Sequence, residues 1–60
     1  MPAPDEINQL DVRMNNRAKD QHGNLQITVF FRNGKTHRFR NQDALIYDAI
    51  IRKTRPQPNT

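Results

Sequence analysis

Hydrophobic and polar residues alternate most regularly between residues 25 and 32. Leu25, Ile27, Val29 and Phe31 fall on one face of an extended chain, and polar residues separate the first three. β-Branched and aromatic side chains, which favour the pleated surface of a sheet, are dense in this segment. The pattern predicts a strand over residues 25–32 with one buried face.

Asn33-Gly34 follows this strand and is typical of a tight β-hairpin, with residues 35–40 as the returning strand. A two-residue loop would place arginines on the apolar face. A three-residue loop, with Gly34 in the left-handed conformation, would instead pair Ile27 with Phe39. Because this second register leaves no arginine in the core, we predict the three-residue loop and an inward Phe39.

A weaker alternation precedes the hairpin. Leu10, Val12 and Met14 alternate with charged residues, which predicts a strand over residues 9–15 with these three on its buried face. Turn-forming residues follow from Asn15 to Asn24, including Gly23, which can take the positive φ of a tight reversal.

A helix is predicted over residues 42–54. Asn41 is a good N-cap, and Asp43 places a negative charge in the first turn, where the helix dipole favours it. Cations cluster at the other end, and Pro56 stops the helix. The fold class is therefore α+β, a three-stranded antiparallel sheet packed on one C-terminal helix (βββα).

Sixty residues with 33% hydrophobic content suffice for one small domain, which we expect over residues 7–54. Residues 1–6 and 55–60 are rich in proline and are expected to be disordered tails. The absence of cysteine excludes disulfides and thiolate metal ligands. The sequence has neither a leader nor the ~20 apolar residues of a membrane span, so we expect a cytoplasmic protein with no membrane partner.

The net charge of +4 is concentrated in the middle of the chain. Residues 1–12 hold three acids and no cation, whereas residues 13–40 hold seven cations and only Asp20 as an acid. A solvated surface that keeps a small protein soluble would explain this charge equally well.

The face of the predicted hairpin opposite the core is the candidate nucleic-acid interface. It would present arginines, hydroxyls, an amide and one aromatic ring, from Gln26, Thr28, Phe30, Arg32, Thr36, Arg38 and Arg40. Cations and hydroxyls contact phosphates, and an exposed ring stacks on bases. This pattern favours a DNA-binding regulator or accessory factor, with DNA preferred over RNA. The alternatives are an ordinary solvated sheet face with Phe30 covered, or a host-protein partner bound by these side chains or at a sheet edge.

Catalytic and metal sites find little support. His22 and His37 lack a third histidine or a cysteine to complete a zinc site, and the chain has no serine for nucleophilic catalysis. Asp43 and Asp48 are five residues apart on a helix and so face different sides. We therefore expect a protein that is not an enzyme and uses no cofactor and no metal.

The predicted helix has more apolar surface than the sheet can cover. If its main apolar stripe packs inward, a second patch is left over, and the reverse arrangement exposes still more. The candidate interface for a homodimer or another partner consists of Leu45, Ile46, Ala49 and Ile50.

The order strand, strand, strand, helix over residues 10–54 is similar to the arm-type DNA-binding domains of phage and transposon integrases and to the plant AP2 domain. The resemblance is one of topology, length and charge. It implies that the outer sheet face enters the DNA major groove while the helix backs the sheet. We expect the chain to stand alone rather than to precede a recombinase, and so expect a small regulator of a phage, plasmid or bacterial genome.

Overall fold

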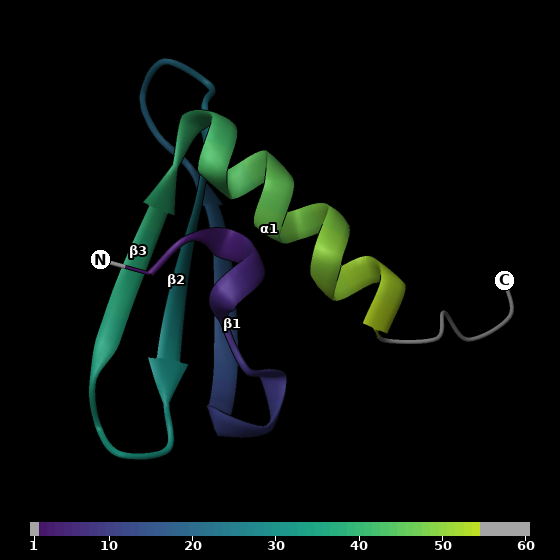
Figure 1. Cartoon of the computed structure of the whole chain (residues 1–60). Coiled ribbons are helices and arrows are strands. Elements are labelled where there is room, and N and C mark those ends of the chain that lie inside the picture. The colour runs from purple at the N-terminus through teal and green to yellow at the C-terminus, as the bar shows by residue number, and fades with distance from the viewer. Residues whose placement is uncertain (1, 55–60) are drawn as a thin grey trace, which may run out of the picture.

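The computed structural model describes residues 2–54, except for the side chain of Thr54, so the expected tail at 55–60 lies outside the described residues. Three strands form one antiparallel sheet in the order β1-β2-β3, and a helix follows (Figure 1). The elements are η1 (Pro4–Glu6), η2 (Gln9–Asp11), β1 (Val12–Lys19), β2 (Leu25–Phe31), β3 (Thr36–Arg40) and α1 (Asn41–Thr54). The βββα fold is confirmed.

The β2–β3 hairpin has the predicted register, with Ile27 opposite Phe39. The Phe31 N–H donates to the Lys35 carbonyl at 2.8 Å and closes a loop of three residues. Gly34 has φ 90°, as the left-handed position of this loop requires. Phe39 is 2% exposed and lies in the core, which confirms the choice of register.

Strand β1 differs from the prediction in both its bounds and its faces. It runs from Val12 to Lys19, well into the segment expected to be a turn, and a β-bulge interrupts its pairing between Val12 and Met14. The extra residue turns the rest of the strand over. Val12 is buried as expected, but Met14 pairs with Phe30 and is exposed, and Leu10 lies in η2 and is 81% exposed.

Asp20 and Gly23 shape the turn that joins β1 to β2. Gly23 has φ 81°, as predicted. The Asp20 carboxylate accepts the backbone N–H groups of Asn24 at 2.9 Å and His22 at 2.8 Å. Chiefly through the bond from Asn24, these contacts lower the pKa of Asp20 below its usual value.

The core lies between one face of the sheet, the inner face, and the helix. It consists of Val12, Ile27, Val29, Phe39, Ala44, Tyr47 and Ile51. The Phe39 and Tyr47 rings are 5.0 Å apart between centroids. Both η1 and α1 cover this inner face, and no described element covers the opposite, outer face (Figure 1).

The N-terminal segment is packed rather than extended. Residues 1–6 were expected to be a disordered tail, but Pro4–Glu6 form η1, Pro4 is buried, and η1 contacts α1. The Ala3 N–H donates to a Glu6 carboxylate oxygen at 2.7 Å, which holds this turn closed. Alternation alone could not predict it, because a single 3₁₀ turn is too short to show periodicity.

Helix α1 begins at Asn41, one residue before the predicted start, and Asn41 has a left-handed φ of 54°. Asp43 lies in the first turn and Arg52 and Lys53 in the last, as predicted. Within residues 2–54, the structure contains no helix whose length and apolar character would let it cross a membrane.

Candidate nucleic-acid interface

The outer face brings together all the predicted interface residues except Arg32. Because Ile27, Val29 and Phe39 point inward, the residues between them point outward. Strand pairing places Gln26 opposite Arg40, Thr28 opposite Arg38, and Phe30 opposite Thr36. The side chains of these three pairs are therefore neighbours on the outer face, as the sequence predicted.

Arg32 lies outside the strands, in the turn that follows β2, and it contacts the N-terminal segment. Its Nε donates to the Leu10 carbonyl at 3.0 Å, and its backbone N–H donates to the Asp11 carbonyl at 2.9 Å. These bonds tie η2 to the end of the hairpin. Arg32 is therefore an anchor of the fold, and the outer face loses one predicted cation.

Arg13 was not among the predicted residues and takes that place. Its guanidinium lies over the ring of Phe30, 5.9 Å from the ring centroid, a cation–π arrangement. Pairing between β1 and β2 brings the two side chains together, since Met14 is the partner of Phe30. The sequence alone shows an arginine in the first strand, but not that the bulge would set it beside the aromatic ring.

None of the described strand positions of the outer face carries a carboxylate. The strand positions that compose this face are Arg13 at the bulge, Met14, Asn16, Ala18, Gln26, Thr28, Phe30, Thr36, Arg38 and Arg40. The two ion pairs of residues 2–54 both involve Asp48, which lies on the other side of the sheet. The charges of Arg13, Arg38 and Arg40 are therefore not neutralised by an ion pair within the described part of the chain.

Contacts within the outer face orient its arginines without covering them. The Arg38 Nε donates to the Thr28 hydroxyl at 3.4 Å, across the β2–β3 pair. Asp43 lines a shallow hollow with Arg38 and Arg40 at the edge of β3, but it forms an ion pair with neither. Arg38 and Arg40 both remain exposed, so their guanidinium groups can meet an anion from solvent.

The candidate partner interface on α1 is partly exposed. Leu45 is 60% exposed, Ile46 is 44% exposed and Ala49 is exposed, whereas Ile50 is half-buried. The helix buries Ala44, Tyr47 and Ile51 against the sheet instead. This orientation leaves Leu45 and Ile46 as the apolar surface of α1.

The histidines lie apart from each other. His22 is in the exposed β1–β2 turn, and the His37 ring packs edge-on against Phe39 at 4.6 Å on the inner side of β3. Among residues 2–54, no three His, Cys, Asp or Glu side chains are close enough together to hold a metal ion.

Comparisons of the chain with protein-family models, with curated proteins and with solved structures found no match. The surface chemistry described above therefore carries the functional proposal.

Proposed function

We propose that the chain binds nucleic acid, with DNA preferred, through the outer face of its sheet. The observation that supports this proposal is a face whose described strand positions carry three cations and no carboxylate, and which no described element covers. Within this proposal the chain acts as a regulator or accessory factor, without catalysis and in the cytoplasm.

The dimensions of the sheet suit the DNA major groove. Neighbouring strands are about 4.8 Å apart, so the β2–β3 ribbon is narrow compared with a groove about 12 Å wide. Arg38 and Arg40 are two residues apart on one strand, which separates their Cα atoms by about 6.7 Å and lets them meet different phosphates. The major groove of A-form RNA is too deep and narrow for this approach, which favours DNA.

Phe30 adds a contact that does not depend on charge. Its ring is half-buried, and Arg13 lies over it on the outer face. Such a ring can stack on a base or touch a thymine methyl group. We therefore expect the arginines to set the salt dependence of binding and Phe30 to add affinity at all salt concentrations.

The test is a salt titration of binding to a short DNA duplex. Three phosphate contacts predict a log–log slope of about −2.7, from roughly −0.9 per contact, and Arg38→Ala should reduce its magnitude by about 0.9. Phe30→Ala should weaken binding by about 1–3 kcal/mol with the slope nearly unchanged. Arg52→Ala is the matched control, because Arg52 is exposed on the other side of the sheet.

The proposal fails if the parent protein shows no salt-sensitive binding to DNA. It also fails if Arg38→Ala and Arg40→Ala bind as tightly as Arg52→Ala. Either result would mean that the arginines are a solvated surface. A protein partner would then become the leading alternative for this face.

A further inference from the structure

The free edge of β1 has unused backbone hydrogen-bonding groups. In an antiparallel pair, residues whose backbone N–H and C=O groups point toward the partner strand alternate with residues whose groups point away from it. The Asp20 N–H donates to the Asn24 carbonyl at 2.9 Å. The backbone groups of Asp20, and of every second residue before it in β1, therefore point toward β2. The N–H and C=O groups of Asn15, Arg17 and Lys19 therefore point away from β2, along an edge that no other strand of residues 2–54 covers.

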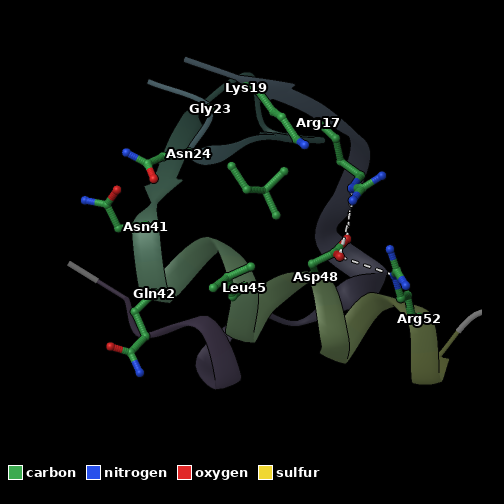
Figure 2. A pocket seen from close by; sticks show the side chains of 10 residues that line it. Arg17, Lys19, Gly23, Asn24, Asn41, Gln42, Leu45, Asp48 and Arg52 are labelled. Carbon is green, nitrogen blue, oxygen red and sulfur yellow. Dashed lines mark hydrogen bonds and ion pairs between the residues drawn. The ribbon is translucent and has the colours of Figure 1, made fainter. Parts of the chain in front are cut away.

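The side chains of these residues lie on the inner face, and those of Arg17 and Lys19 line a hollow between β1 and α1 (Figure 2). Leu25 and Leu45 supply apolar surface in this hollow. Its charged side chains are Arg17, Lys19, Arg52 and Asp48, three cations and one acid, with a net charge of +2. A ligand that lies along β1 is therefore next to a surface with a net positive charge.

Asp48 holds the two arginines in place without using all their donors. Its carboxylate is 2.9 Å from the Arg17 Nε and 3.2 Å from the Arg52 Nε. The side chains of Arg17 and Arg52 are still 50% and 63% exposed, whereas that of Asp48 is only 12% exposed. Lys19 is exposed and makes no ion pair with any described residue. The guanidinium groups of Arg17 and Arg52 and the ammonium group of Lys19 thus lie beside the position that an added strand would occupy.

We propose that β1 accepts an extended acidic segment of a partner protein as a fourth, antiparallel strand. Acidic side chains of that segment lie opposite Arg17 and Lys19, while the residues between them lie beside Met14 and Ala18 on the outer face. The partner sequence that fits is one in which acidic and β-branched residues alternate. This inference does not rest on DNA binding, because the backbone pairing lies at the free edge of β1 and the charged contacts lie on the inner face.

Charge selects this partner over a second copy of the chain. Strand β1 contains Arg13, Arg17 and Lys19 and no acid, and β3 contains Arg38 and Arg40 and no acid. Pairing either edge with its own copy, or β1 with β3, would bring like charges together, which destabilises a sheet. An acidic strand replaces that repulsion with attraction.

The probe is a fluorescent peptide, acetylated and amidated, in which glutamate alternates with valine, and binding is followed by anisotropy with the full chain. We expect saturable binding that weakens with salt, and slower amide hydrogen exchange at Arg17 and Lys19. A peptide with lysine in place of glutamate should not bind. In this antiparallel register the glutamate N–H groups face β1, so N-methylation at the glutamates should abolish binding and N-methylation at the valines should preserve it.

A pair of charge-reversal variants completes the test. Lys19→Glu should weaken peptide binding on the order of tenfold, whereas Lys53→Glu, at an exposed lysine of α1, should leave it nearly unchanged. Arg38→Ala should affect DNA and not the peptide, which separates this proposal from the DNA-binding one. Absence of saturable binding, equal binding of the lysine peptide, or equal effects of the two N-methylation patterns would each overturn the proposal.

Discussion

The hydroxyl of Tyr47 allows a sharp test of how the helix is held on the sheet. Tyr47 is fully buried, and its ring packs 5.0 Å from that of Phe39. Tyr47→Phe keeps this ring and its burial and removes only the hydroxyl. The resulting change in stability therefore reports on the polar contacts of that group.

The size of the effect follows from the groups around the hydroxyl. It donates to the Asn15 side-chain oxygen at 2.8 Å and accepts from the Gln9 side-chain nitrogen at 3.2 Å. The Asn15 Nδ2 is buried and has no hydrogen-bond partner among residues 2–54. Tyr47→Phe also removes the hydrogen bond to the oxygen of the same amide. Gln9 is only half-buried and can bind water instead. We expect the free energy of unfolding to fall by about 1–2 kcal/mol, which lowers Tm by roughly 5–15 °C in a domain this small.

Urea unfolding followed by circular dichroism measures the change. Asn15→Val is the companion variant, because it replaces the acceptor with a β-branched residue suited to a strand. The double variant should lose less stability than the sum of the two single variants, since replacing both partners leaves no unpaired acceptor. Wild-type stability in Tyr47→Phe, or strict additivity in the double variant, would refute this reasoning.

Two further predictions concern the turns that flank the sheet. Asn41 has a left-handed φ of 54°, so Asn41→Ala should reduce the free energy of unfolding by about 1 kcal/mol in urea titrations, whereas Asn41→Gly should match or exceed the parent. A more stable alanine variant would contradict this. The lowered pKa of Asp20 in the folded protein means that its charged carboxylate stabilises the fold. This stabilisation is fully present at a pH above the pKa of Asp in the unfolded chain, and it is lost as the pH falls through the lower pKa of the folded state. Asp20→Asn should therefore be less stable than the parent at pH 7, with a difference that shrinks as the pH falls to about 2; a constant difference would argue against this role.

Local chemistry made the hairpin and the helix predictable. Asn33-Gly34 limits the loop to a few conformations, and the need to keep arginine out of the core selects one register. That register placed Phe39 inward and put Arg38 and Arg40 on the outer face, as the structure confirms. The greater part of the candidate site follows from this one turn.

The sequence predicted a first strand, but the bounds and faces of β1 were not predictable because its inner face is polar. Asn15 and Arg17 occupy positions where alternation predicts apolar residues, and their partners are Tyr47 and Asp48 on the helix, 32 and 31 residues away. No glycine marks the bulge that sends Met14 outward. These features depend on tertiary contacts, and the positions of Arg13 beside Phe30 and of Arg32 beside Leu10 depend on them in turn.

The strand order β1-β2-β3 also has a kinetic consequence. Each strand pairs with the one that follows it in the chain, so both hairpins close over short loops, and the entropy lost on forming the sheet is small. The contacts of the N-terminal segment with α1 span a longer stretch of the chain; the Gln9–Tyr47 hydrogen bond, for example, joins residues 38 positions apart. We expect rapid folding in which the hairpins form first and the docking of the N-terminal segment on α1 completes the native state.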